Sequence, residues 1–520
     1  MGVLAVYLAV MRGQIEAYDT QAMISVTKNL IDHGSLTLAG GGWPLSTPYS
    51  PYGIGISVLA IPAYLVSKWT GHFPILVSVI APVLTALCVV LVFRIGRCLR
   101  WKPSHCVFAA VAFGLLSMAV WYTTELFSEP AVTLCVLVII LGLLRWNQGQ
   151  RWAPLWIGIA AAAAVQFRSD SIVTVWILLL ATPLFVPWSE VRSRRTLALV
   201  TGPMALSLVL LGGYNELRYK QIFISSYGPG GGFSTSIFHG LRGFLVSPGK
   251  SLFVFNPLTL VGVVGLVLIL FVPSMLNRPL GALCLLAIFP RALFFAKWGV
   301  WDGGWVWGPR FLLPAVAVLS LTIIPVLQAT DRRRVVGVVT RIAVGVLAVF
   351  AIFVNVLSVR VPLGNWLGFL SNPHWRRVYD IHGLETAAAQ ANAVDFDLTK
   401  SPIWGYILLL RHHLAVMGPD LWTAGHSAGL GYVLLAVGAM ALVGAAYGAR
   451  AHGRRHRARS EGDDVAVLAG AQTPDGDGTA EQAIHESPNP EDLRYRNAAL
   501  VLGPRQLLND GNQIYRELGN

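Results

Sequence analysis

Long apolar runs separated by short polar segments make up most of this chain. Apolar runs of about 17–25 residues can cross a bilayer as helices, because a helix satisfies its own backbone hydrogen bonds in lipid. With residues 3–11 taken as the end of a first span that starts before Met1, the pattern predicts an all-α polytopic membrane protein of about twelve spans. The other predicted spans are residues 73–93, 105–121, 127–144, 153–166, 172–186, 197–214, 252–272, 280–296, 311–327, 342–359 and 429–447.

Two shorter patterns in the first long polar segment predict helices that do not span. Residues 54–66 are apolar over only about 13 residues and are interrupted by a proline, which favours an interfacial or re-entrant helix. Apolar residues at helical spacing predict a second helix that begins at Thr20, directly after Asp19, and ends at Gly34. This second helix is expected to lie along the outer membrane surface.

Composition agrees with a membrane protein, and charge gives its orientation. Charged residues are 12% of the chain and the mean hydropathy is +0.60, whereas a soluble domain carries about 25% charge. The formal net charge of +13 comes from short basic clusters between apolar runs, so no nucleic-acid partner is expected. These clusters fall in every second loop, which the positive-inside rule places in the cytoplasm. The segments expected outside are residues 12–72, 215–251, 297–310 and 360–428.

The predicted organisation is a transmembrane core over residues 1–359, an extracytoplasmic segment over 360–428, a last span over 429–448 and a cytoplasmic tail over 449–520. The tail contains a stretch rich in acidic residues and without Lys or Arg, a composition typical of disorder. The histidines and aspartates of the extracytoplasmic segment fit no standard metal-site spacing. This segment is therefore expected to be an acceptor-side loop or small cap.

Charged and aromatic side chains collect at the predicted outer ends of the spans. Taken singly, Asp19 is most simply a helix cap, and the others are interfacial anchors. Together they would line one outer cavity that suits a phosphate-bearing lipid donor. Cations would hold its phosphate, tryptophans would stack a sugar, and a carboxylate would take a proton from an acceptor hydroxyl. The set comprises Glu125, Glu129, Arg168, Asp170, Asn215, Glu216, Arg218, Lys297, Trp298, Trp301, Asp302, Trp305, Trp307 and Arg310, with Asp19 in the first outer loop.

Four stretches in a particular order carry a resemblance to a known family. The first is Asp19, fifteen residues before Gly34, followed by Pro48-Tyr-Ser-Pro-Tyr-Gly53. The others are Phe127-Ser-Glu-Pro130; Tyr214-Asn-Glu-Leu-Arg-Tyr219 with Ser247-Pro-Gly-Lys-Ser-Leu-Phe253 and Asn256-Pro257; and Gly303-Gly304 with Trp307-Gly-Pro-Arg-Phe-Leu-Leu-Pro314. Over about residues 16–325 the chain resembles the GT-C glycosyltransferases, in the bacterial group related to protein mannosyltransferases and lipid A aminoarabinose transferases.

The resemblance implies a GT-C fold with interfacial helices in the first outer loop. It also implies sugar transfer, with inversion, from a polyprenyl-phosphate carrier to an acceptor on the outer face of the bacterial inner membrane. Asp19 matches the family's catalytic acid and would act as general base, and Arg310 matches its Gly-x-Arg position and is the first candidate for the donor phosphate. The remaining candidates are Lys297, Arg218 and Arg168 for the phosphate, and Glu129, Asp302, Trp301, Trp305 and Tyr52 for the pocket.

The sequence departs from the family pattern at two places. The first span is short, and Thr20 stands where many relatives have glutamate. No Asp-x-Asp occurs in the first outer loop, so no cofactor and no required metal are expected. The acceptor is expected to be a cell-envelope glycan, glycolipid or protein.

A lipid or saccharide transporter or flippase is the first alternative function. It shares the span count, although the two halves of the chain show no internal repeat. A non-catalytic membrane scaffold is the second alternative.

Overall fold

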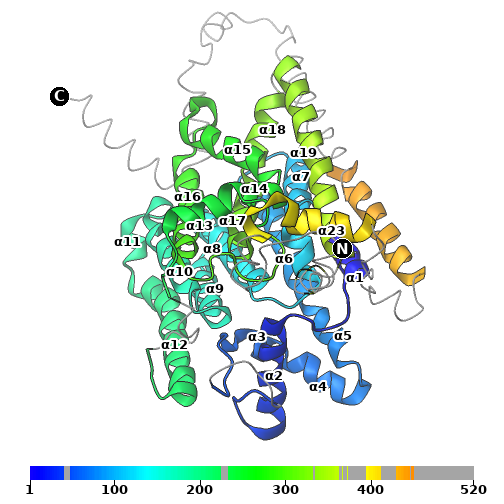
Figure 1. Cartoon of the computed structure of the whole chain (residues 1–520). Coiled ribbons are helices and arrows are strands. Elements are labelled where there is room, and N and C mark those ends of the chain that lie inside the picture. Colours follow the sequence, from blue (N-terminus) through cyan, green and yellow to red (C-terminus); the bar gives the residue numbers. More distant parts are fainter. Residues whose placement is uncertain are drawn as a thin grey trace, which may run out of the picture.

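The computed structural model is helical throughout the part of the chain that it describes (Figure 1). In that part, β-type pairing is limited to an isolated antiparallel bridge between Thr37 and Tyr49. The predicted all-α class is therefore confirmed. The predicted tail beyond Ala449 lies outside the described residues, as does most of the segment 360–428. The described residues are 1–39, 47–223, 232–331, 334–361, 366, 370, 372, 394–411, 429–445 and 447–449.

Seven helical stretches of the described residues are long and apolar enough to cross a membrane, and each contains a predicted span or most of one. The protein is therefore a polytopic membrane protein. The stretches are α5 with α6 (Phe73–Ser78 and Ile80–Cys98), α8 (Glu129–Asn147), α12 (Arg194–Tyr219), α16 (Arg278–Lys297), η5 with α17 and α18 (Arg310–Leu312, Leu313–Leu321 and Ile323–Asp331), α19 (Arg334–Arg360) and Gly429–Ala449.

Shorter apolar helices pack among the long ones. The predicted partial first span is α1 (Gly2–Val10), which packs against α6. The others are α7 (Pro103–Gly114), α9 (Ala153–Phe167), α10 with η2 (Ser171–Leu180 and Thr182–Leu184), α13 (Ile237–Val246) and α15 (Thr259–Phe271).

The predicted single span over residues 252–272 is wrong, because two helices occupy it. The first, α14 (Leu252–Phe255), ends at Asn256, and Pro257 follows before α15 begins. Proline has no N–H to donate and cannot continue a helical ladder. The Asn256 side chain instead accepts a hydrogen bond from the backbone N–H of Met118 at 2.9 Å. The break therefore ties two parts of the bundle together.

The predicted span over residues 105–121 is also divided. Helix α7 ends at Gly114, and a 3-10 helix, η1 (Met118–Thr123), follows it. The Ser117 side chain accepts a hydrogen bond from the backbone of Ala119 and so starts a new turn. Local side-chain capping of this kind competes with helix continuation.

The helices predicted to lie at the membrane surface are present at one end of the bundle, with α2 (Tyr18–His33) packed against α3 (Ile54–Leu59) and α4 (Ile61–Thr70) (Figure 1). Pro62 lies in the first turn of α4 and divides the predicted helix 54–66 in two. Helix α2 ends, as predicted, at Gly34 in the left-handed conformation.

The centre of the bundle is formed by α8 and by the stretch Arg310–Asp331. In the most apolar part of α8, 78% of the residues are buried, and in that of Arg310–Asp331 89% are. The corresponding share for α12 is 17%. The first residues of α8 and η5 and the last residues of α9 lie at the same end of the bundle as α2. Glu129 begins α8, Arg310 begins η5, and Arg168 directly follows α9. Charged residues that are far apart in sequence are thereby brought next to Asp19 in the first turn of α2.

Candidate active site

Asp19 has both carboxylate oxygens occupied by side chains. Its Oδ1 accepts a hydrogen bond from the Tyr52 hydroxyl at 2.6 Å, and its Oδ2 accepts one from Arg310 Nη1 at 2.7 Å. Helix α2 starts at Tyr18, and its N-cap is Ala17. The predicted start at Thr20 and the interpretation of Asp19 as a helix cap are therefore wrong. The carboxylate is held by a guanidinium and a phenol instead of by the backbone N–H groups of the helix.

The surroundings of Asp19 keep it ionised. Burial by itself raises the pKa of Asp19, but the charge of Arg310 and the hydrogen bonds from Tyr52 and Arg310 outweigh burial. The pKa therefore lies below its ordinary value, and the charge of Arg168 contributes in the same direction. At neutral pH Asp19 is a carboxylate, the form that a proton acceptor needs.

Arg310 is positioned by a glycine-rich turn. Gly303 and Gly308 both have positive φ, +74° and +67°. At Gly303 an added Cβ would come within 2.8 Å of the Arg310 side chain, so glycine there makes room for it. The Arg310 guanidinium lies 4.9 Å from the ring centre of Phe311 and 5.7 Å from that of Phe127. These rings restrict the planar group to one orientation, facing Asp19.

A second carboxylate joins Arg310 to Arg168. Glu129 Oε1 accepts a hydrogen bond from Arg168 Nη1 at 2.8 Å and lies 3.5 Å from Arg310 Nε. Arg168 Nε and Nη2 donate to the two oxygens of Asp170, the shortest contact being 2.6 Å. The result is a continuous chain of ionic contacts from Asp19 to Asp170. We call these five residues, together with Tyr52, the charged network.

Several buried polar atoms at the network have no hydrogen-bond partner within the described part of the chain. They include Glu129 Oε2 and Arg310 Nε. Arg291 is also buried there, and its Nη2 has no such partner. Buried polar atoms in proteins are nearly always paired with protein groups or with ordered water, so these atoms can bind water or a polar ligand.

The formal charges of the charged network balance once the nearby Arg291 is counted with it. Asp19, Glu129 and Asp170 supply three negative charges, and Arg168, Arg310 and the nearby Arg291 supply three positive ones. Buried charges are tolerated when they are paired in this way. An incoming phosphate therefore has to compete with a carboxylate for a guanidinium.

Arg218 makes no ion pair with the carboxylates of the charged network within the described residues, and it holds the loop that carries Tyr52, to whose carbonyl it donates a hydrogen bond at 3.4 Å. It donates hydrogen bonds to the carbonyl of Ser50 and to Asn215 Oδ1. Its guanidinium lies 3.6 Å from the ring centre of Tyr214. With its donors directed at the chain itself, Arg218 is placed to position Tyr52 rather than to bind the donor phosphate as predicted.

The predicted site residues at and just after the end of α16 differ in exposure and in contacts. Lys297 is exposed, and no ion pair of the described residues includes it. Trp301 is buried against Phe244, so it offers no open face for a sugar, contrary to the prediction. Asp302 accepts a hydrogen bond from the backbone of Gly304 at 3.2 Å. Trp305 is 43% exposed and keeps an open ring.

Lys250 was not among the predicted site residues, although it lies in one of the motifs. It is buried, and its ammonium donates to the carbonyls of Gly304 at 2.6 Å and Val306 at 3.0 Å. These carbonyls belong to the turn that carries Arg310. The sequence signal that could have identified Lys250 is a lysine in a short Ser/Pro/Gly-containing stretch directly before an apolar run. Arg291, in the middle of a predicted span, gives a similar signal.

Glu125 anchors the start of the first outer helix. Its carboxylate accepts a hydrogen bond from the backbone N–H of Glu16 at 2.8 Å, beside the Arg12–Glu16 ion pair. Burial raises the pKa of Glu125 to about 7. Between about pH 5 and 7 the folded protein therefore keeps a proton that the unfolded chain releases. This contribution to stability is present below the ordinary pKa and is lost as the pH rises through 7.

We therefore predict that the wild-type melting temperature falls between pH 5 and 8 relative to that of Glu125→Gln, by about 1–3 °C. Glutamine keeps an acceptor for the Glu16 N–H but cannot titrate. Thermal unfolding of both proteins in the same detergent, at half-unit pH steps, measures the difference. Parallel curves across this range would show that Glu125 does not titrate there.

No group of three or more His, Cys, Asp or Glu side chains among the described residues has the geometry of a metal site. The expectation that no metal is required stays a prediction. Five histidines and tryptophans of the segment 360–428 lie outside the described residues. They are His374, Trp375, His382, His412 and His413.

The chain is similar in fold to ArnT, a lipid A aminoarabinose transferase, from Cupriavidus metallidurans. The crystal structure of that protein bound to undecaprenyl phosphate matches with a TM-score of 0.48 and 14% sequence identity, over 84% of this chain and 75% of that chain. Its apo structure matches with a TM-score of 0.48 and 13% identity, over 84% and 74%. No protein-family model matches the sequence, and no curated protein matches it either. The similarity to these two structures is one of fold.

Proposed function

We propose that this protein is a glycosyltransferase that moves a sugar from a polyprenyl-phosphate carrier to an acceptor hydroxyl, with inversion at the anomeric carbon. The observation that carries the proposal is the ion pair between Asp19 and Arg310, 2.7 Å apart at one end of the bundle. It combines a carboxylate that can accept a proton with a guanidinium suited to phosphate. The GT-C resemblance of the sequence motifs supports the same function.

In the proposed step the acceptor hydroxyl loses its proton to Asp19 while its oxygen bonds to the anomeric carbon. The bond between that carbon and the carrier phosphate oxygen breaks, and its electron pair stays on the phosphate. The products are the glycosylated acceptor and polyprenyl phosphate. Attack from the face opposite the leaving phosphate inverts the anomeric configuration. Arg310 stabilises the negative charge that develops on the phosphate.

Competition for Arg310 links donor binding to the activation of Asp19. Before the donor binds, Arg310 lowers the pKa of Asp19, which makes the carboxylate a weak base. A phosphate that takes part of the guanidinium weakens this ion pair. The pKa of Asp19 then rises towards its ordinary value when the acceptor proton has to be taken. Because Asp19 and the phosphate compete for the same guanidinium, the exchange follows from the contact between Asp19 and Arg310.

The other network residues are proposed to position these two. Glu129 and the Asp170–Arg168 pair fix Arg310 from the side away from Asp19. Tyr52 orients the Asp19 carboxylate through its 2.6 Å hydrogen bond. The exposed ring of Trp305 is proposed to stack the sugar, and the exposed Lys297 to meet the carrier's phosphate as it enters.

The charge pattern of the sequence supports the proposed orientation in the membrane. The loops rich in arginine are assigned to the cytoplasm, so the charged network faces the outer side of the bacterial inner membrane. The tail 449–520 is then cytoplasmic. The acceptor is proposed to be a cell-envelope glycan, glycolipid or protein reached from outside.

A panel of polyprenyl-phosphate sugars tests the proposal with the full chain in lipid. We expect one donor to release polyprenyl phosphate in the presence of a cell-envelope extract, and the product to have the opposite anomeric configuration to the donor. Movement of an intact labelled donor across the bilayer without release would instead identify a flippase. Neither release nor movement, with a folded protein, would favour a scaffold.

We predict that Lys250→Met lowers the rate of transfer by about tenfold or more, because the turn that carries Arg310 loses its two hydrogen bonds to the ammonium. Methionine fills the space of the lysine stem without the charge. The pH–rate profile should also shift, because Arg310 no longer lies in a fixed position beside Asp19. Unchanged rate and unchanged profile would remove Lys250 from the account.

A further inference from the structure

A polar cavity lies at the end of the bundle opposite the charged network. Its walls come from the end of α8, the start of α9, α11 (Trp188–Val191) and the start of α12. Helix α8 has 19 residues, so at 1.5 Å per residue about 28 Å separates this cavity from Glu129. Its volume is about 550 Å³, which lies in the range of small-molecule and cofactor sites. The proposed transfer reaction makes no use of it.

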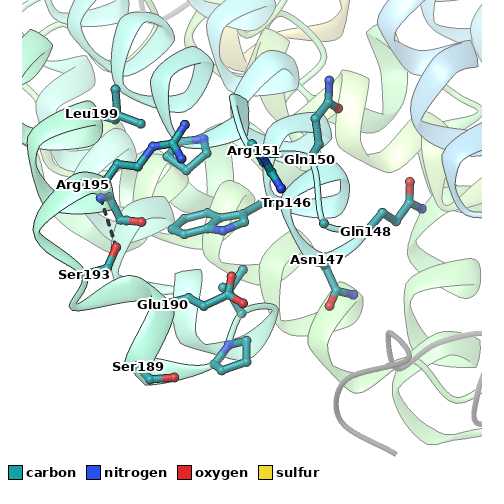
Figure 2. Close-up of a pocket in the computed structure, with 15 residues that line it drawn as sticks. Trp146, Asn147, Gln148, Gln150, Arg151, Ser189, Glu190, Ser193, Arg195 and Leu199 are labelled. Carbon is teal, nitrogen blue, oxygen red and sulfur yellow. Dashed lines mark hydrogen bonds between the residues drawn. The ribbon is translucent and has the colours of Figure 1, made fainter.

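Positive charge predominates around the cavity. Arg151 and Arg195 line it, against a single carboxylate, that of Glu190. Neither arginine takes part in an ion pair within the described residues. In Figure 2 the two guanidiniums lie on one side of the Trp146 indole, and the Glu190 carboxylate lies on the other. An anion that binds the two arginines therefore does not have to displace the Glu190 carboxylate from either of them.

Neutral polar groups complete the lining. Asn147 and Gln150 contribute amides, and Ser189 and Ser193 contribute hydroxyls. Such groups donate and accept hydrogen bonds with phosphate oxygens and with hydroxyls of a headgroup. The buried indole of Trp146 forms an apolar part of the wall. This mixture fits a polar, charged headgroup better than a purely apolar molecule.

Exposed tryptophans place the cavity at the depth of the membrane surface. Trp152, Trp156 and Trp188 are each more than half exposed beside it. Exposed tryptophans of membrane proteins collect at the level of lipid headgroups. Arg195 lies 5.4 Å from the ring centre of Trp152, and Arg192 lies 5.2 Å from that of Trp188. The cationic groups and the interfacial rings therefore form one surface.

We infer that this cavity binds the phosphate headgroup of an anionic membrane phospholipid. The two arginines hold the phosphate, the amides and hydroxyls bind headgroup hydroxyls, and the acyl chains lie along the exposed tryptophans. Basic pockets between helices at this membrane surface have the charge that anionic headgroups require. The net charge of the lining, two arginines against one glutamate, favours an anionic lipid over a zwitterionic one.

Equilibrium binding of radiolabelled dioctanoyl phosphatidylglycerol to the full chain in a neutral detergent tests this inference. The double variant Arg151→Gln/Arg195→Gln should bind at least about tenfold more weakly. Glu190→Gln should bind more tightly, a change that misfolding does not produce. Arg278→Gln, an exposed arginine at the start of another helix, is the matched control and should bind like wild type.

Competition distinguishes the sources of the phosphate. Dioctanoyl phosphatidylcholine and glycerol 3-phosphate should displace the label only at much higher concentrations. Equal displacement by glycerol 3-phosphate would overturn the inference in favour of a soluble phosphate ester. Equal displacement by phosphatidylcholine, or equal binding by the double variant, would show that the cavity does not select an anionic headgroup.

Discussion

Replacing Asp19 by asparagine is expected to reduce sugar transfer by about 10²–10⁴-fold, the usual contribution of a general base. Asparagine has the same shape but cannot take a proton from the acceptor. The carrier itself should bind at least as tightly to the variant as to wild type, because Arg310 no longer has Asp19 as a competing partner at 2.7 Å. Turnover and carrier affinity therefore change in opposite directions.

Rates of donor cleavage, with polyprenyl phosphate binding measured separately, check both parts of this prediction. Asp32→Asn is the matched control. Asp32 lies in the same helix, is partly exposed, and pairs with Lys68 away from the charged network. It should keep wild-type turnover. Weaker carrier binding in Asp19→Asn would contradict the competition between Asp19 and the phosphate for Arg310.

Replacing Arg310 by lysine is expected to weaken carrier binding by about 10–100-fold, as for the loss of a charge-assisted hydrogen bond. Lysine keeps the charge, but its compact ammonium lacks the planar set of donors with which a guanidinium can bind Asp19, Glu129 and a phosphate at the same time. Arg310→Ala should also destabilise the protein by about 3–5 kcal/mol, because buried carboxylates would lose their partner. Lysine is therefore the more informative variant.

Arg242→Lys serves as the control for Arg310→Lys. Arg242 is exposed on α13 and lies over the ring of Phe396, 5.3 Å from its centre. Its replacement should leave carrier affinity unchanged. If Arg310→Lys bound the carrier like wild type and turned over at full rate, the donor phosphate would have to lie elsewhere.

Hydrophobic periodicity predicted the helical class and most of the long helices, because burial in lipid requires continuous apolar runs. It did not predict where the runs break. Residues 252–272 are apolar apart from Asn256, Pro257 and Thr259, and the hydrogen bond from Met118 to Asn256 is a tertiary contact. A hydrophobicity pattern carries no information on such contacts.

The candidate site shows the same division. Glu129, Arg168 and Arg310 were predicted from charge at the outer ends of spans, and Asp19 from the first outer loop and the family resemblance. The structure brings these four together. Sequence spacing does not show which cation faces which acid, so Arg218 was assigned to the phosphate although its donors face the backbone. Asp19 was likewise open to interpretation as a cap, because a capping carboxylate and a catalytic one occupy the same sequence position.

Release of polyprenyl phosphate from a polyprenyl-phosphate sugar, compared for wild type and Asp19→Asn in the same lipid with acceptor present, tests the central claim most directly. The account predicts release by wild type and its near-complete loss in the variant, with the variant still folded and still binding the carrier. Equal release by both proteins would remove Asp19 as the base. No release by folded wild type from any donor would contradict the assignment as a glycosyltransferase.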